Sequence, residues 1–472
     1  MISWWLAVPF ALMLMAIAVM PLLPRLSHWW EQAGHQLLLS AVLALPVVIA
    51  MINLDHAGSI GHALLEYAQF VILLFGLFTV AGGLALSGDV AGTPRVNSLF
   101  MLVGAVLASI IGTTGAAMLL IRPMLASNGH RRHRAHLVVF AVFIMANCGG
   151  LLTPLGDPPL FLGLLRGVPF TWTLSLWPQW LFVNALLMIS FYCLDKALIT
   201  DDERRRDIIE PLRVKGKIQI VWFVLIIVAV ALIPSVNVEG YGQVTADGAS
   251  IATAWWLLVP WRELTILLAA GASWLTCDHQ ARFDINHFSF APIMEVAALF
   301  IGIFMTMVPV LMMLDAATGG VALNAVSFHL MTGGLSAVLD NAPTYASFFE
   351  VAQAGAAVST DATLVAGVPE SLLVAISTGA VFWGAMTYIG NGPNFMLRSI
   401  ASHQSIRMPS FIGYIGWSLR WLLPVLLAAM LLFLADGLWA WLAGAALTLL
   451  ILLRAGLLLA GSTRIRLPRR PS

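Results

Sequence analysis

Two short segments combine polar residues with Gly and Pro inside otherwise apolar stretches. Residues 152–161 read LTPLGDPPLF and residues 386–395 read MTYIGNGPNF. When the two are aligned, 234 residues apart, the Thr, the Gly, the second Pro and the Phe coincide, and Asp157 corresponds to Asn391. Because Pro lacks a backbone donor and Gly tolerates unusual backbone angles, each segment predicts a helix broken near its middle.

Two further apolar runs, 96–126 and 323–350, are interrupted by polar residues and by Gly or Pro. The first contains SIIGTTG at 109–115 and the second contains SAVLDNAPT at 336–344. This pattern predicts two re-entrant hairpins, which enter the bilayer and return to the same side. A broken helix or hairpin survives in hydrocarbon only where it faces protein or a wet cavity, so the four segments are expected to line a site.

Asp157 and Asp340 are the acids most suited to ion chemistry, because each falls within an interrupted segment. A carboxylate at the centre of a span costs about 2.5–3.5 kcal/mol, so it needs a cation, a hydrogen-bond shell or a proton. It could exchange a proton for a cation such as sodium, which prefers oxygen ligands. The alternative, compatible role is that each Asp caps a half-helix. Hydroxyl and amide groups of the same segments could complete the site: Thr113, Thr114, Thr153, Asn341, Thr344, Thr387, Asn391 and Asn394.

Two arginines follow interrupted segments and are accessory candidates. Arg122 follows the first hairpin and Arg398 follows the second broken helix. Each could pair with an acid, meet an anionic substrate, or extend to the membrane surface with no role in transport. The His-Arg-Arg-His-Arg run at 130–134, with His136 beyond it, is expected to form a solvated loop, although a pH-sensing role is conceivable.

The composition indicates the elements that must position these residues. Of 472 residues, 60% are hydrophobic and only 10% are charged, and the mean hydropathy is +0.91. A soluble domain would be roughly a quarter charged, so lipid must be the solvent. We therefore expect an all-α membrane protein with about eleven spans and the two hairpins. The expected spans are 2–23, 36–54, 62–86, 137–162, 174–194, 217–236, 253–275, 291–314, 370–400, 410–434 and 437–459.

The basic segments predict the orientation and the organisation. The positive-inside rule places the runs at 130–134, 204–217 and 464–470 in the cytoplasm and the N-terminus outside. The chain then divides into a first half at 1–195, a cytoplasmic linker at 196–216, a second half at 217–460 and a basic tail at 461–472. The two halves enter their hairpins from opposite sides, which makes them inverted repeats, an arrangement typical of secondary transporters.

The DNAPT segment at 340–344 and the IGNGPN segment at 389–394 resemble the ion-transporter superfamily. This superfamily includes arsenite permeases, divalent-anion/sodium symporters, citrate–metal transporters and D-type sodium/proton antiporters, and the resemblance covers roughly residues 36–435. It implies a scaffold region, a mobile transport region with elevator-like movement and, often, a homodimer. One departure is that the hairpins read GTTG and DNAPT instead of the Ser-Asn-Thr of the sodium-coupled carboxylate symporters.

These observations lead to a hypothesis of a secondary sodium/proton antiporter in a bacterial inner membrane. Asp157 and Asp340 would bind sodium or a proton competitively, with no cofactor and no nucleic-acid partner. The alternative is a sodium- or proton-coupled carrier of citrate, a dicarboxylate or another anion, held by half-helix N-termini. A membrane enzyme is a third class, but no nucleotide-binding loop, metal-binding motif or nucleophilic triad is found in the sequence.

Overall fold

A computed structural model describes residues 3–20, 23, 26–30, 32–200, 210–234, 236, 259–317, 324–358 and 363–461. Within these residues the regular structure is almost entirely helical, and two small two-stranded sheets are the exception. The predicted all-α membrane fold is thereby confirmed. Residues 201–209 of the predicted linker and all of the basic tail except Gly461 lie outside the described residues.

Long apolar helices dominate the described chain. Seven of them are long and apolar enough to cross a membrane, or eight if the pair Phe411–Trp421 and Leu423–Phe433, bent by 42°, forms one span. Shorter apolar helices account for several of the other expected spans, so the number of about eleven stays a prediction.

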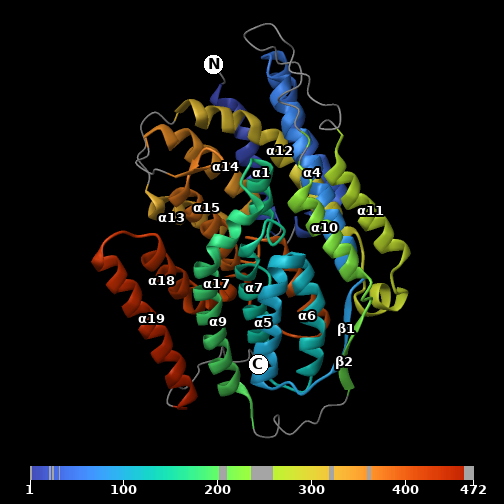
Figure 1. Ribbon diagram of the computed structural model, residues 1–472, viewed down its shortest axis with the longest axis vertical. Coiled ribbons are helices and arrows are strands. Elements are labelled where there is room, and N and C mark those ends of the chain that lie inside the picture. The colour runs from blue at the N-terminus through green and yellow to red at the C-terminus, as the bar shows by residue number, and fades with distance from the viewer. Residues whose placement is uncertain are drawn as a thin grey trace. The chain divides into compact units, whose positions relative to one another are not determined.

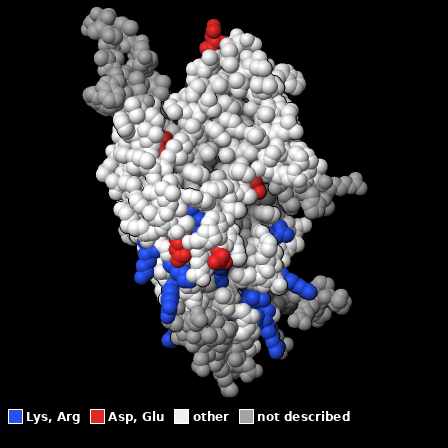
Figure 2. Space-filling view, turned by 90° about the vertical axis from the view of Figure 1, so that its right-hand side faces the viewer, with Lys and Arg blue, Asp and Glu red and all other residues white. Residues whose placement is uncertain are grey.

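The surfaces of these helices match a lipid environment. On α3 (Ala33–Asn53), Leu38, Val42, Leu45 and Ile49 are each more than half exposed, and their spacing places them on one face. Figure 2 shows broad areas of uncharged residues with few acidic or basic side chains among them. Such apolar exposure would be unfavourable in water but is ordinary against acyl chains.

The chain forms two compact units, and each draws on both predicted halves (Figure 1). Unit 1 comprises Met1–Ala85, Leu164–Phe170 and Val214–Met313, and unit 2 comprises Leu86–Gly163, Thr171–Arg213 and Leu314–Ser472. The predicted division into inverted halves stays a prediction.

Unit 1 is built from long helices. The contacts of α4 with α11 and α10 bring the two halves of the sequence together there. The helices that lie wholly or mostly in this unit are η1 (Trp4–Ala7), α1 (Val8–Val19), α2 (Ser27–Trp30), α3, α4 (Ala57–Gly82), α10 (Gln219–Leu232), α11 (Trp261–Leu275), the π-helix η7 (Gln280–Ile285) and α12 (Ala291–Ala317).

Unit 2 contains both interrupted regions together with the C-terminal helices. Its helices are α5 (Pro94–Ile111), α6 (Thr113–Ser127), α7 (Ala135–Ile144), η3 (Cys148–Leu152), α8 (Pro158–Leu165), η4 (Phe170–Leu176), α9 (Trp177–Leu198), α13 (Ala325–Ser336), α14 (Asn341–Ala354), η8 (Gly355–Val358), α15 (Glu370–Trp383), η9 (Gly384–Met386), α16 (Gly392–His403), α17 (Phe411–Trp421), α18 (Leu423–Phe433) and α19 (Leu438–Leu459). The strands are β1 (Ala85–Asp89), paired with β2 (Glu210–Lys215), and β3 (Leu364–Val365), paired with β4 (Val368–Pro369).

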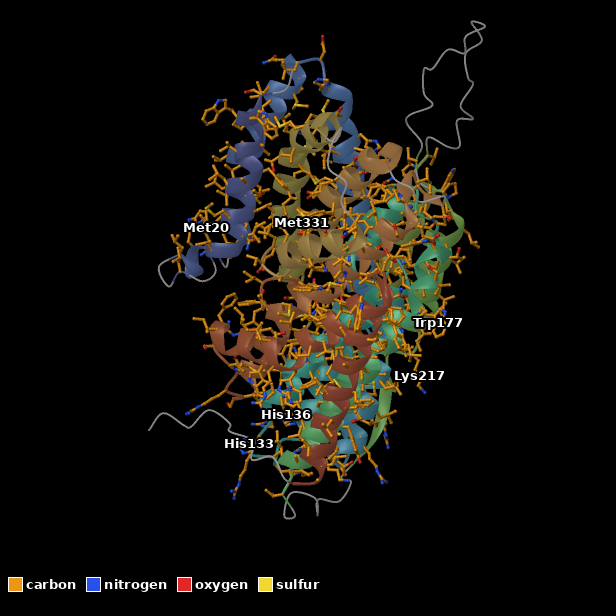
Figure 3. All side chains as sticks on the ribbon, turned by 90° about the vertical axis from the view of Figure 1, so that its left-hand side faces the viewer. Met20, His133, His136, Trp177, Lys217 and Met331 are labelled. Carbon is orange, nitrogen blue, oxygen red and sulfur yellow. The ribbon has the colours of Figure 1, made fainter. Side chains whose placement is uncertain are left out.

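Both predicted hairpins are pairs of helices in unit 2. Thr93 caps the start of α5 by accepting from Val96 N, and Asn324 caps the start of α13 by accepting from Ser327 N. Gly112, at φ +82°, separates α5 from α6, whereas the extended Asp340 precedes α14. Figure 3 labels Met331, which belongs to α13, and His133, which follows α6 in the chain.

Candidate functional site

The interruption in the first broken helix is stabilised by the hydrogen bonds of one threonine. The chain passes from α7 through η3 to Thr153, whose backbone is extended, and resumes as α8. The Thr153 hydroxyl donates to Ser109 O in the hairpin and accepts from Leu155 N at 3.2 Å. A backbone carbonyl near the end of α5 and a backbone amide that follows the break are thereby satisfied inside the protein.

The second broken helix repeats this arrangement. Thr387 is also extended, between η9 and α16, and its hydroxyl donates to Ala337 O in the second hairpin at 2.6 Å. It accepts from Ile389 N and Gly390 N at 3.3 and 3.2 Å. The correspondence of Thr153 and Thr387 in the sequence is therefore also a correspondence of contacts.

The aligned glycines have a steric role at both breaks. A Cβ on Gly156 would lie 2.1 Å from Gly150 O, and a Cβ on Gly390 would lie 2.6 Å from Gly384 O. Only Gly allows the chain to fold back so closely on the preceding short helix. This packing sets the direction in which Asp157 and Asn391, the next residues along the chain, project.

The Asp157 carboxylate lies where the hairpins and the broken helices of unit 2 converge. It is 1% exposed and accepts hydrogen bonds from Thr113 Oγ1 at 3.2 Å, Asn391 Nδ2 at 3.1 Å and Asn341 Nδ2 at 2.5 Å. These donors come from the first hairpin, the second broken helix and the second hairpin. All three are neutral, so a negative charge on Asp157 would have only these hydrogen bonds, and no counter-ion among them, to stabilise it.

Asn147, which lies between α7 and η3, is a member of this network that the sequence did not suggest. It is fully buried, donates to Asn394 Oδ1 at 2.7 Å and accepts from Asn391 Nδ2 at 3.1 Å. Asn394 in turn donates to Gly384 O and Thr387 O. The only sequence signal was an isolated polar residue between an apolar run and two glycines.

Asp340 has a different environment from Asp157. It is half-buried and caps α14, with its carboxylate accepting from Ala342 N at 3.2 Å. Thr344 donates to Asp340 O at 3.1 Å. The capping alternative therefore describes Asp340 well, and its neighbour Asn341 is the residue that contacts Asp157.

In the described structure, the remaining predicted residues, Thr114, Arg122 and Arg398, form no side-chain hydrogen bond with this network. Thr114 is half-buried beside Thr113. Arg122 is nine residues further along α6 and half-buried, which is about 13 Å of helix from Thr113. The Arg398 guanidinium lies 4.8 Å from the ring centroid of Tyr388, whose hydroxyl donates to Pro409 O. Arg398 thus joins α16 to Tyr388 in the interrupted part of the second broken helix.

The arrangement around Asp157 retains capacity to bind a small cation. A carboxylate has about four acceptor positions, of which three are occupied. The buried Asn341 Oδ1 atom has no hydrogen-bond partner in the described structure, and it belongs to the same amide that donates to Asp157. The described residues contain no group of three His, Cys, Asp or Glu that could hold a metal ion. Carboxylate, amide and hydroxyl oxygens favour a hard cation over a transition metal.

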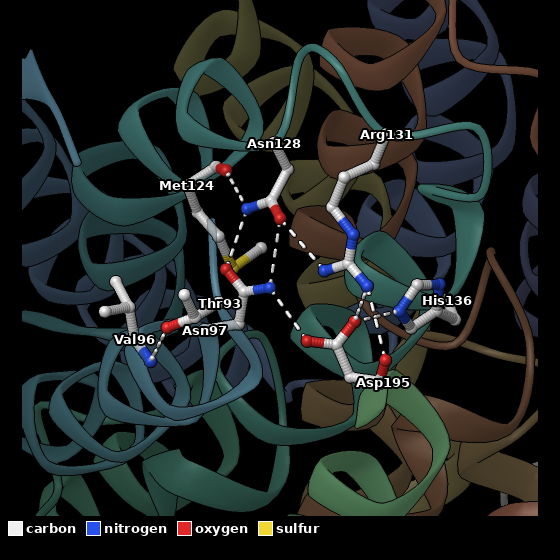
Figure 4. A network of polar contacts seen from close by, with 8 residues as sticks. All are labelled: Thr93, Val96, Asn97, Met124, Asn128, Arg131, His136 and Asp195. Atoms are coloured by element: carbon white, nitrogen blue, oxygen red, sulfur yellow. Dashed lines mark hydrogen bonds and ion pairs between the residues drawn. The ribbon is translucent and has the colours of Figure 1, made fainter. Parts of the chain in front are cut away.

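A second buried polar network in unit 2 corrects an expectation (Figure 4). Arg131 and His136, expected in a solvated loop, are 3% and 2% exposed, and both contact Asp195 Oδ1, at 2.6 and 2.8 Å. Asn97 donates to Asp195 Oδ2 at 2.8 Å and is bonded in turn to Asn128. The loop folds inward because Asp195, 59 residues beyond His136, supplies a buried charge that needs these partners.

These features define a class: a multi-pass helical membrane protein whose broken helices and hairpins enclose a buried carboxylate. A family model described as "Putative citrate transport" matches residues 1–434. The chain belongs to this citrate transport family and is a secondary transporter, not an enzyme. No curated protein matches the chain. The family agrees with the resemblance to ion transporters, whereas the antiporter and permease branches stay proposals.

We predict that Asn147→Ala weakens the binding of a cation at Asp157 about tenfold. The reason is that Asn391 and Asn394 lose a buried partner that orients them. The measurement is the half-saturating ion concentration in proteoliposomes. Asn184→Ala is the matched control, since Asn184 is also buried, and within the described residues it donates to backbone carbonyls, Cys148 O and Trp180 O, instead of the side chains of the network. Equal effects of the two substitutions would show that Asn147 acts only through general packing.

We further predict that Asp195→Asn destabilises the protein by about 3–5 kcal/mol, because Arg131 is left buried without its counter-ion. Unfolding in detergent, followed by circular dichroism, measures this change. Asp284→Asn removes an exposed carboxylate and should change stability by no more than about 0.5 kcal/mol. A change that small for Asp195→Asn as well would mean that the network contributes no net stability.

Proposed function

We propose that the protein is a sodium/proton antiporter in which Asp157 binds the cation or the proton. The observation that carries this proposal is a buried carboxylate held only by neutral donors, beside an amide oxygen with an unused acceptor position. Sodium would take oxygen ligands from Asp157, Asn341 and Thr113, and its charge would compensate the carboxylate. A proton would compensate the same charge, so the two ions compete.

Asp340 would support exchange without being a required ligand. Its carboxylate lies at the start of α14, next to Asn341, and raises the negative charge around the site. Two nearby carboxylates disfavour an anionic substrate unless a cation lies between them. The two accessory arginines give no support for an anion at this point, because Arg398 is engaged with Tyr388 and Arg122 lies further along α6.

Transport of citrate or another carboxylate is the second candidate, and the family description favours it. In this case the cation at Asp157 would be the coupling ion, and the substrate would bind as a complex with a cation or at the half-helix N-termini. The two candidates share the cation site and differ in whether a carboxylate substrate is transported.

The proposal extends to the setting in which exchange takes place. We place the protein in a bacterial inner membrane, and the basic segments favour an N-terminus outside and a C-terminus in the cytoplasm. The resemblance to ion transporters favours elevator-like alternating access in a homodimer.

The deciding experiment imposes a pH gradient on proteoliposomes and adds sodium, lithium, potassium, citrate or succinate one at a time. A pH-sensitive dye should report collapse of the gradient by sodium or lithium alone. A response that requires citrate or succinate would overturn antiport in favour of the second candidate. No response to any of the five would reject both.

We predict that Asp157→Asn abolishes this exchange, leaving the rate of empty liposomes, because an amide neither carries a compensating charge nor releases a proton. Asp340→Asn should slow exchange or weaken ion affinity, because it removes a negative charge beside the site, whereas the amide oxygen can still accept from Ala342 N. Asp284→Asn, at an exposed site outside the network, serves as control. Normal exchange by the Asp157 variant would show that the cation binds elsewhere.

We also predict that the half-saturating sodium concentration rises as pH falls, by up to about tenfold per pH unit where the protonated site predominates. The sign follows from competition, because each added proton occupies the carboxylate that sodium needs. Initial exchange rates at several pH values measure this dependence. A half-saturating concentration that stays constant with pH would contradict a shared carboxylate.

A further inference from the structure

Two arginines meet around one tryptophan at the C-terminal end of unit 2. Arg454 on α19 donates from Nη1 to Arg420 O on α17 at 2.6 Å, and its guanidinium lies 3.7 Å from the ring centroid of Trp421. The Arg420 guanidinium lies 5.7 Å from the same ring. Trp421 also stacks on Trp417, with ring centroids 6.5 Å apart. The pair of helices thus presents two cations on an aromatic support.

The described residues supply no carboxylate for either charge. The ion pairs found among them involve other arginines and histidines, namely Arg131, Arg166, Arg262, His62 and His136. Arg454 Nη2 is buried and has no hydrogen-bond partner in the described structure. Two like charges in a lipid-solvated region repel one another, and aromatic contact offsets only part of that cost.

The surroundings of the two arginines are apolar and open to the bilayer. Leu419 is 50% exposed, and Leu450 and Leu453 are 59% and 56% exposed. Arg454 is five residues before the end of α19, or about 8 Å along the helix axis. That depth and the neighbouring tryptophans are typical of the boundary between headgroups and acyl chains.

We propose that Arg420 and Arg454 bind the phosphodiester headgroup of an anionic phospholipid. The guanidinium group matches phosphate geometry, and the single negative charge of a phosphodiester would reduce the net positive charge of the pair. The exposed leucines would contact the acyl chains of the same lipid. An arginine that merely extended to water would need neither the second arginine nor the tryptophan support. Basic pockets between membrane helices are known to take such headgroups.

The test uses the full-length protein purified in a non-ionic detergent, with native mass spectrometry and thermal unfolding as readouts. Phosphatidylglycerol, phosphatidylcholine and inorganic phosphate are added separately. The wild type should retain phosphatidylglycerol in preference to phosphatidylcholine. R420Q and R454Q should each weaken this binding about fivefold. R407Q, which removes an exposed arginine between α16 and α17, is the matched control and should leave it unchanged.

Arg420 is exposed, so R420Q should not disturb buried packing. The test therefore remains decisive with R420Q even if R454Q unfolds. Equal retention of the two lipids, or equal loss in R420Q and R407Q, would overturn the site. Stabilisation by inorganic phosphate alone, equal to that by phosphatidylglycerol, would show a free-phosphate site and overturn the lipid assignment. None of these readouts depends on transport, so they stand apart from the antiport proposal.

Discussion

Backbone groups freed at a helix break must find partners inside the protein, because hydrocarbon offers none. Unit 2 meets this constraint twice with the same device. Thr153 and Thr387 each satisfy a hairpin carbonyl and the amides after the break, and a glycine lets the chain pass against the preceding short helix. Each hairpin is therefore tied to the broken helix of its own half.

This fastening determines where the polar side chains meet. With both breaks fixed, Asp157 and Asn391 project from corresponding positions toward each other, and Asn341 reaches the same carboxylate from the second hairpin. Asn147 then joins the first half to Asn391 and Asn394 of the second. A displacement of either half would alter the hydrogen bonds of the Asp157 carboxylate. Coupling of ion binding to movement requires a link of this kind.

Two other buried ionisable residues of the described chain, Asp195 and Arg282, have surroundings that differ from those of Asp157. Asp195 contacts Arg131, His136 and Asn97, so an arginine of the protein already compensates its charge. In unit 1, Arg282 is fully buried between Trp274 and Phe288, at 4.7 and 5.4 Å from their ring centroids. The carboxylate of Asp157 differs from that of Asp195 because its hydrogen-bond partners in the described structure are neutral, and an unused amide oxygen of Asn341 lies beside it.

The sequence by itself determined the solvent, the class of fold and the interrupted segments. Hydropathy reports directly on lipid exposure, and Gly and Pro report locally on backbone breaks, so the Thr, the Gly and the Asp or Asn of each broken helix could be identified. The partners of Asp157 could be proposed as a group, because they belonged to the same four segments. Only the tertiary structure decided that Asn147 joins them, that Arg398 braces Tyr388, and that Arg131 and His136 are buried against Asp195. The contacts of Asn147 and Asp195 join residues far apart in the chain, and side-chain partners at such separations follow from packing rather than from local pattern.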